Sequence, residues 1–294
     1  HDYTFELDMP PRFVLPNPDF TVMAEFRVDQ PASAWVAQLR YALEPASRVL
    51  AARALRAFTS DPALLVGLKN AFDVERHHAV RREIVGTMRF LPNDSAKERA
   101  LLDASRDDHA AVRENAVAAL SDLGGSQSVA DRLFELAQND PSYRVQSQAV
   151  VALARIGAPT AVDVFRSALI TPSFREYVRR AAFQALTYLE LPANEEYRIA
   201  NEHSRPGQPT EVRSAAIRHL GVLAADQRRA LDRLIALAND ATYDVRRAVI
   251  AALETVEDPR AVEALEARLT EEPEPKLREL LRETVQKWHV TFAE

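Results

Sequence analysis

The sequence predicts an all-α fold, a right-handed α-α superhelix of about eight helix pairs with a short N-terminal β segment. Three observations predict it: a recurring two-residue step, a composition that suits helices, and helix-breaking residues between apolar stripes. The step recurs every 32 to 34 residues, which is typical of a solenoid whose units bury their apolar faces only against neighbours. The eight steps are Ser47-Arg48, Val80-Arg81, Val112-Arg113, Val145-Gln146, Val178-Arg179, Val212-Arg213, Val245-Arg246 and Leu277-Arg278.

The composition favours packed helices over a sheet. Of the 294 residues, 47% are apolar, 7% are aromatic and only 7 are glycine. The formal net charge of -6 gives no electrostatic reason to expect nucleic acid, and no apolar run approaches the roughly 20 residues of a membrane helix. Cysteine is absent, which excludes disulfides and Cys-ligated metals. We therefore expect a soluble protein with neither a nucleic-acid nor a membrane partner, and the compartment, cytoplasmic or periplasmic, stays unknown.

One repeat, residues 129–156, illustrates the expected helix pair. Apolar residues at helical spacing predict a first helix that ends near Asn139. Asp140 is expected to cap a second helix with Pro141 in its first turn, and Gly157 is expected to end that helix. Residues 234–256 follow the same plan. First helices are expected to begin in the same way at Asp61-Pro62 and Asp258-Pro259.

The repeat resembles the HEAT family in a short, tight form. Its features are an Asp, a Val-Arg step about six residues later, and then Ala and Leu on the second helix. The turn motif of ankyrin repeats and the Trp-Leu-Gly-Tyr pattern of tetratricopeptide repeats are both missing. The resemblance covers residues 32–285, so we assign residues 31–294 to a HEAT-repeat α-solenoid. Such arrays serve unrelated roles, and the fold therefore leaves the function open.

The repeated arginine is expected to be structural. It follows a core residue, so it lies on the flank of the second helix, within reach of an Asp or a helix-end carbonyl in a neighbouring unit. Gln146 interrupts this ladder, although Arg144 could take its place. The predicted ladder consists of Arg48, Arg81, Arg113, Arg179, Arg213, Arg246 and Arg278, with Asp140 and Asp240 as acceptors.

The first thirty residues do not repeat and predict strands. Apolar and polar residues alternate around Phe5 and again over residues 20–28, which is the pattern of half-buried strands. Two or three strands do not make a stable sheet alone. We therefore assign residues 1–30 to the terminal strands of a β-sandwich-like domain whose earlier part lies upstream.

The junction with the repeats resembles bacterial aminopeptidase N-like gluzincin zinc metallopeptidases. The matching stretches are FVLPNPDF from Phe13, EFRV from Glu25 and WVAQLRYA from Trp35. In that family a catalytic domain precedes a small β-sandwich and helical repeats. The resemblance implies that this chain is the non-catalytic C-terminal region, which closes over the active-site cleft and limits peptide access. It also implies zinc in a parent catalytic domain, with that domain as the partner and a peptide as a compatible substrate.

The zinc chemistry of that family has no counterpart in these residues. Its site needs two His four positions apart with Glu between them, and the seven histidines do not supply that pattern. His77 and His78 are expected to form the polar entry to a second helix, His219 to pack or face solvent, and the run 271–275 to be a solvated turn. We expect no catalytic residue, cofactor or metal in this chain, and whether a parent protein is an enzyme stays open.

Three other functions compete with the peptidase reading. A free-standing HEAT adaptor for protein-protein interaction is the main alternative, because the repeats suit binding. An enzyme built on short HEAT repeats, such as a chromophore lyase, is weaker because no nucleophile or acid-base set is visible. A nucleic-acid-binding array is weaker still, because the chain has no basic excess.

Overall fold

The computed structural model describes residues 4–24, 26–256 and 258–291. Within these residues there are sixteen α-helices, which follow one another as eight pairs, and no β-strand. The predicted all-α class of stacked helix pairs is therefore confirmed. Two compact units divide the chain, the first ending at Ala158 and the second starting at Pro159.

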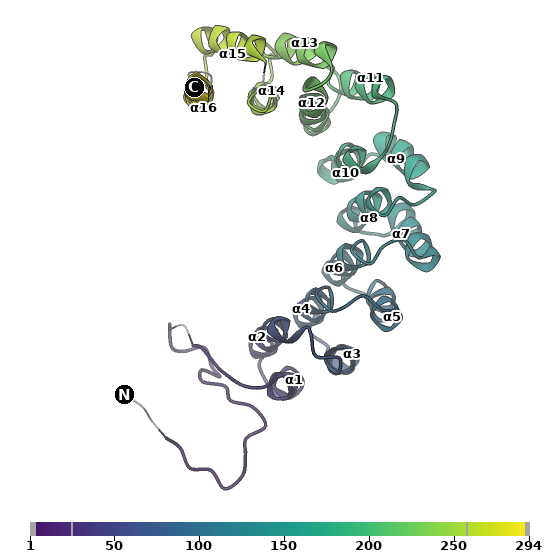
Figure 1. Ribbon diagram of the computed structural model, residues 1–294, viewed down its shortest axis with the longest axis vertical. Coiled ribbons are helices and arrows are strands. Elements are labelled where there is room, and N and C mark those ends of the chain that lie inside the picture. Colours follow the sequence, from purple (N-terminus) through teal and green to yellow (C-terminus); the bar gives the residue numbers. More distant parts are fainter. Residues whose placement is uncertain (1–3, 25, 257, 292–294) are drawn as a thin grey trace. The chain divides into compact units, whose positions relative to one another are not determined.

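The first unit contains four helix pairs. Its helices are α1 (Ala32–Tyr41), α2 (Pro45–Ala54), α3 (Leu64–Val74), α4 (His78–Met88), α5 (Ser95–Ala104), α6 (Ala110–Leu120), α7 (Gln127–Asn139) and α8 (Tyr143–Arg155). A 3-10 turn, η1 (Leu55–Phe58), extends α2. The second helices α2, α4, α6 and α8 pack on one another in order and form one layer, which we call the second-helix layer (Figure 1).

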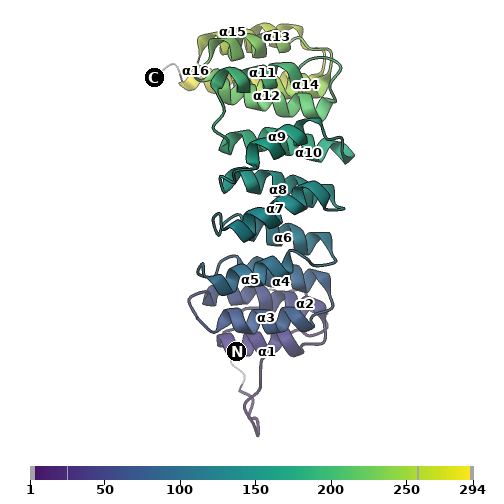
Figure 2. The same ribbon diagram turned by 90° about the vertical axis from the view of Figure 1, so that its right-hand side faces the viewer.

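The second unit repeats this plan. Its helices are α9 (Ala161–Ile170), α10 (Tyr177–Ala185), α11 (Ala193–His203), α12 (Thr210–Ala224), α13 (Arg228–Leu237), α14 (Tyr243–Leu253), α15 (Pro259–Glu271) and α16 (Pro275–Thr291), with 3-10 turns η2 (Phe174–Glu176) and η3 (Leu186–Tyr188). Here α10, α12, α14 and α16 form the second-helix layer. Figure 2 shows the helix pairs of each unit stacked one upon the next.

The first residue of each step anchors the core. Each is at most 2% exposed, and burying a Val or Leu side chain contributes about 1.5 to 3 kcal/mol. These residues are Ser47, Val80, Val112, Val145, Val178, Val212, Val245 and Leu277. The step therefore holds each second helix against its neighbours and leaves the following residue at the edge of the core.

Glycine allows one especially close contact between second helices. A Cβ atom built on Gly221 of α12 would lie 3.0 Å from the Cβ of Ala252 in α14. Gly157 serves a different purpose: it follows α8 with a φ of 65°, which confirms the predicted glycine at the end of that helix.

Two of the predicted helix starts are wrong by a few residues. α8 begins at Tyr143, and Asp140 stands instead at the end of α7, where its carboxylate accepts the Ser142 N–H at 2.8 Å. In the same way Asp61 accepts the Ala63 N–H, and α3 starts only at Leu64. An Asp followed by Pro forms a local turn of this kind as readily as a helix cap. Asp258 does cap α15, as predicted.

The strands predicted over residues 3–28 are wrong within the described residues, 4–24 and 26–28. A strand needs a neighbouring backbone to satisfy its N–H and C=O groups, and the prolines of this segment remove several donors. The turn at residues 17–22 is closed by one side chain instead: the Asn17 amide donates to the Val22 carbonyl at 3.0 Å and accepts the Val22 N–H at 3.3 Å. Tyr3 and Glu25 lie outside the described residues.

A chain of amide groups ties this N-terminal segment to the first helices. The Val14 N–H donates to Gln30 Oε1 at 3.0 Å, and Gln30 Nε2 donates to Gln38 Oε1 at 3.1 Å. Gln38 Nε2 in turn donates to the Ser47 carbonyl at 3.0 Å. Both glutamines are buried. The segment is thus bonded to α1 and α2, and it belongs to the same compact unit as the first repeats.

Candidate functional site

The repeated arginine bridges two turns of the chain. Arg113 Nε and Nη2 donate to the two carboxylate oxygens of Asp140, at 2.7 and 2.8 Å. Its Nη1 donates to the carbonyls of Asp107 and Asp108, at 2.8 and 3.0 Å. One guanidinium therefore joins the turn before its own helix to the corresponding turn of the next repeat. Parallel hydrogen bonds between a guanidinium and a carboxylate are among the strongest in proteins.

Four further arginines donate to both carboxylate oxygens of an acid in the next repeat; three use Nε and Nη2, whereas Arg213 uses Nη1 and Nη2 and donates from Nε to the Ser204 carbonyl. Most of these contacts lie between 2.6 and 3.2 Å, and the side chains of all four pairs are at most 16% exposed. The pairs are Arg48 with Glu75, Arg81 with Asp107, Arg213 with Asp240 and Arg246 with Glu272.

Three of the five acceptors were missed by sequence reasoning, which named only Asp140 and Asp240. Glu75, Asp107 and Glu272 hold the same place. The available signal was spacing, because every acceptor precedes the next step's second residue by six positions. Glu272 also corrects the predicted solvated turn at 271–275: it is 3% exposed and bonds both Arg246 and Arg268.

Two of the predicted ladder arginines, Arg179 and Arg278, depart from this geometry, and Gln146 interrupts the ladder as expected. Gln146 donates to the Asp140 carbonyl at 2.6 Å and reaches no acid, and Arg144 does not replace it because Arg144 pairs with Glu114 at 3.0 Å. Arg179 pairs with Glu176, three residues earlier, at 3.4 Å. Arg278 donates to the Pro273 carbonyl at 3.4 Å.

Four acids of the ladder, Glu75, Asp107, Asp240 and Glu272, have a lowered pKa, which favours the charged form. Burial alone would raise the pKa of Glu272, but hydrogen bonds from Arg246, from the Glu274 N–H and from Arg268 outweigh it and lower this pKa to about 2. The same competition between burial and an arginine lowers the pKa of Asp240, with Arg213 as its partner. In the five paired positions the arginine and the acid thus satisfy each other's charge, which is a structural role.

The other buried titratable groups are also engaged locally. Lys97 is 1% exposed, and its Nζ donates to the carbonyls of Arg89 and Leu91 and to Asn93 Oδ1, at 2.7 to 2.9 Å. All three of its protons thus have acceptors. His219 is 5% exposed and contacts Glu196 at 3.0 Å; burial lowers its pKa, although Glu196 opposes that shift.

A stack of histidines lies where second helices begin. His77 caps α4 by accepting the Ala79 N–H, and His109 caps α6 in the same way, so the predicted polar entry at His77 is confirmed. The His78 ring stacks on His109 with centroids 3.8 Å apart. Within the residues that the structure describes, no group of three or more His, Cys, Asp or Glu is arranged to hold a metal ion.

A polar hollow of about 460 Å³ lies on the first unit's second-helix layer, on the side that faces away from the first helices. Its charged and amide groups come from three consecutive second helices: Arg82 and Glu83 on α4, Glu114 and Asn115 on α6, and Arg144 on α8. The Asn115 amide donates to the Arg82 carbonyl at 3.0 Å, which links α6 to α4. A lining of this kind suits hydrogen bonding with a polar surface of another molecule.

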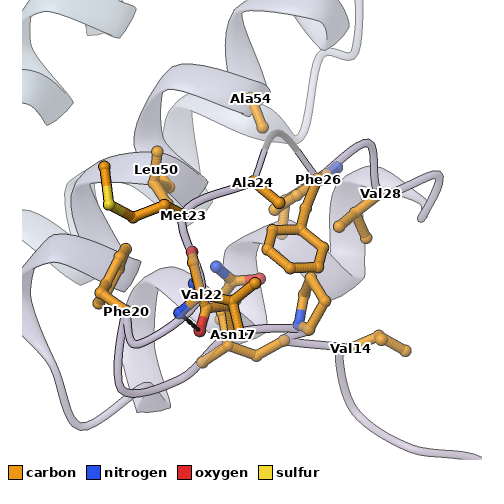
Figure 3. A pocket seen from close by; sticks show the side chains of 14 residues that line it. Val14, Asn17, Phe20, Val22, Met23, Ala24, Phe26, Val28, Leu50 and Ala54 are labelled. Atoms are coloured by element: carbon orange, nitrogen blue, oxygen red, sulfur yellow. Dashed lines mark hydrogen bonds between the residues drawn. The ribbon is translucent and has the colours of Figure 1, made fainter.

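An apolar pocket of about 820 Å³ lies between the N-terminal segment and the first two helices (Figure 3). Phe20, Val22, Met23 and Phe26 of the segment face Leu50 of α2 across it. Met23 and Val22 are more than half exposed. This is an apolar surface without catalytic groups, and it lies apart from the hollow between α4, α6 and α8.

Comparison with known proteins gives one family. A family model of HEAT repeats matches residues 98–187 and 204–286, which together make up more than half of the chain. No curated protein matches the sequence. None of the helices, as far as the structure describes them, is long and apolar enough to cross a membrane.

Several solved structures are similar in fold. The karyopherin Kap121p bound to the extreme C-terminus of the protein phosphatase Cdc14p is 12% identical with a TM-score of 0.58, over 86% of this chain and 33% of that one. The complex of CpcE and CpcF of phycocyanin lyase from Nostoc sp. PCC7120 is 19% identical with a TM-score of 0.50, over 84% and 98%. Human deoxyhypusine hydroxylase in complex with glycerol is 21% identical with a TM-score of 0.38, over 88% and 96%. At these identities the first two likenesses show the fold alone.

The resemblance to aminopeptidase N-like zinc metallopeptidases is therefore wrong. The matches are to HEAT repeats and to helical-repeat structures. Residues 13–28, which carried the first two of the three matching stretches, also lack the strands of a β-sandwich in their described part. Short apolar and proline-containing stretches recur in unrelated proteins, so this motif had little power to discriminate. The zinc and the catalytic domain were expected on this resemblance alone, and no comparison tests them.

Proposed function

The chain belongs to the HEAT-repeat family, and from this premise we propose that it is a protein-binding adaptor. A partner protein would lie along the first unit's second-helix layer, on the side that faces away from the first helices. The polar hollow of α4, α6 and α8 would be one contact area. The observation that carries the proposal is this hollow, because three successive repeats contribute charged and amide groups to one surface. Interfaces between proteins combine such polar groups with shape complementarity.

The ladder supports the proposal by fixing the register of the repeats. Each pair, such as Arg113 with Asp140, joins one turn to the next and is buried. A surface whose helices are already held in place loses less conformational freedom on binding, which favours affinity. Similar folds are also seen with bound proteins: the karyopherin Kap121p is bound to a segment of a phosphatase.

The test compares two charge-reversal variants in affinity capture from cells that naturally make the protein. In the first, Arg82→Glu and Arg144→Glu change the hollow. In the control, Arg99→Glu and Arg198→Glu make the same change of charge on exposed positions of the first helices α5 and α11. We expect a partner that is enriched by the wild type and by the control, but depleted at least several-fold with the hollow variant.

Melting temperature and helical content of both variants must match the wild type, so that loss of capture reports the surface. Cross-linking mass spectrometry then locates the contact. If the captured protein cross-links mainly to first helices, or if both variants capture it equally, the proposed surface is wrong.

A further inference from the structure

Three arginines lie on the second unit's second-helix layer, on the side that faces away from the first helices. Arg180 is on α10, Arg218 on α12 and Arg247 on α14, and all three are exposed. These helices pack on one another in that order (Figure 1). Within the described part of the chain, neither Arg180 nor Arg218 has an acidic partner, and Arg247 contacts only the exposed Asp244, at 3.3 Å. This contrasts with the ladder, where each paired arginine shares a buried acid.

The charges of Arg180 and Arg247 act on Arg218, which lies between them in the order of the helices. The pKa of Arg218 is lowered from its ordinary value by partial burial and then by the like charges of Arg180 and Arg247. Like charges held together in this way destabilise the folded chain slightly, and an anionic ligand would relieve the repulsion. The repulsion is surprising in a chain whose formal charge is -6, because acids outnumber bases and could have neutralised the cluster.

An aromatic edge adjoins the arginines. The Arg180 guanidinium lies over the ring of Tyr177, 5.8 Å from its centroid. The ring centroids of Tyr177 and Phe174 are 6.5 Å apart, and Phe174 is 69% exposed. The turn that presents Phe174 holds Arg175 and Glu176 at φ values of 50° and 55°. Left-handed conformations at two successive non-glycine residues are costly and concentrate at functional sites. This turn, η2, also contacts α12.

The spacing indicates what kind of anion fits. Neighbouring packed helices have axes about 8 to 10 Å apart, so the arginines from α10 to α14 spread over roughly 16 to 20 Å. A single phosphate or carboxylate cannot reach them all. An extended peptide rises about 3.3 Å per residue and would cover this span with about five or six residues.

We propose that Arg180, Arg218 and Arg247, with Tyr177 and Phe174 at their edge, bind an acidic peptide segment of the partner protein. Carboxylates of the segment would pair with the guanidiniums, and an apolar residue would pack on the two aromatic rings. The proposal rests on the adaptor function and names the chemistry of its partner.

The experiment measures binding of labelled peptides to the full chain by fluorescence anisotropy. The probes are a six-residue Glu peptide ending in Phe, the same peptide with Gln for every Glu, a phosphoserine peptide carrying one phosphate, and a single-stranded oligonucleotide. The variant is Arg180→Glu with Arg218→Glu, and the matched control is Arg99→Glu with Arg198→Glu on the first helices. Both variants must retain the wild-type melting temperature.

We expect the Glu peptide to bind the wild type and the control equally. The Arg180/Arg218 variant should bind it about tenfold or more weakly, and the wild type should lose affinity as salt rises, because exposed charge pairs carry the contact. Binding no tighter than that of the Gln peptide, or unaltered binding by the variant, would overturn the proposal. So would preference for the oligonucleotide or for the phosphoserine peptide. A partner captured through the hollow of α4, α6 and α8 would still support the adaptor function in any of those cases.

Discussion

Arg246 donates from Nε and Nη2 to both carboxylate oxygens of Glu272, at 2.9 and 2.8 Å, although the two residues are 26 positions apart. Both side chains are at most 7% exposed. The contact joins the start of α14 to the turn between α15 and α16. A local sequence motif thus produces a bond between consecutive repeats.

Removing one side of this pair should destabilise the protein strongly. Arg246→Ala leaves the Glu272 carboxylate buried with fewer donors, and we expect a loss of about 2 to 4 kcal/mol in the free energy of unfolding. Arg247→Ala, one residue later, removes an exposed pair with Asp244 and should cost less than about 0.5 kcal/mol. Urea denaturation followed by circular dichroism measures both. Equal losses in the two variants would contradict a structural role for the ladder.

Acid should weaken the same contact. The pKa of Glu272 is about 2 in the folded chain against an ordinary value of 4.5, so its carboxylate stabilises the fold above pH 4.5. That contribution is lost as the pH falls from about 4.5 towards 2. We therefore expect the difference in melting temperature between the wild type and Glu272→Gln to be largest near pH 7 and to shrink across that range. A difference that does not vary with pH would argue against the bonded carboxylate.

Two glycines in second helices should respond to alanine in opposite directions. Gly86→Ala meets only the ends of flexible side chains, Arg56 Nη2 at 3.3 Å and Asn115 Nδ2 at 3.5 Å, and should stabilise by up to about 1 kcal/mol through helix propensity. Gly221→Ala meets Ala252 at 3.0 Å and should destabilise by about 1 to 3 kcal/mol, since α12 and α14 must move apart. Thermal melting compares them, and Ala252→Gly should partly rescue the second variant.

Deleting residues 1–28 should leave the helices folded and reduce self-association. The segment exposes large apolar side chains, among them Phe5, Leu7 and Met23, whereas Gln30, which bonds Gln38, is retained. Exposed apolar patches favour association. Light scattering and melting curves of both chains test this. A deletion that unfolds the first repeats would show that the segment is part of their core.

The helices were predictable because the step repeats with little variation. A buried residue such as Val145 followed by a flanking polar residue defines one face of a helix, and eight copies remove the ambiguity of any one. The N-terminal segment has no copy to compare with. Its alternation matched a strand, but strand formation depends on a partner backbone, which the pattern does not report.

The candidate surfaces were harder to predict for a related reason. Arg180 and Arg247 each follow a ladder position and look like simple surface charge in the sequence, while Arg218 stands one helical turn away from the equivalent Ser214. Only the packing of α10, α12 and α14 brings them into one group. The aromatic edge depends on left-handed residues at Arg175 and Glu176, and no glycine marks that turn.

The six-residue interval between each ladder acid and the following step sets where the repeat can change in length. The interval is constant from Asp107 to Arg113 and from Asp240 to Arg246, whereas the distance from an arginine to its acid is 26 or 27 residues. An extra residue in the first helix or the loop before it can be looped out without moving either end of the bond. An extra residue inside the interval would rotate the guanidinium away from its acceptors. Insertions that arise during evolution, or that are engineered as tags and epitopes, should therefore survive on one side of the acid and fail on the other.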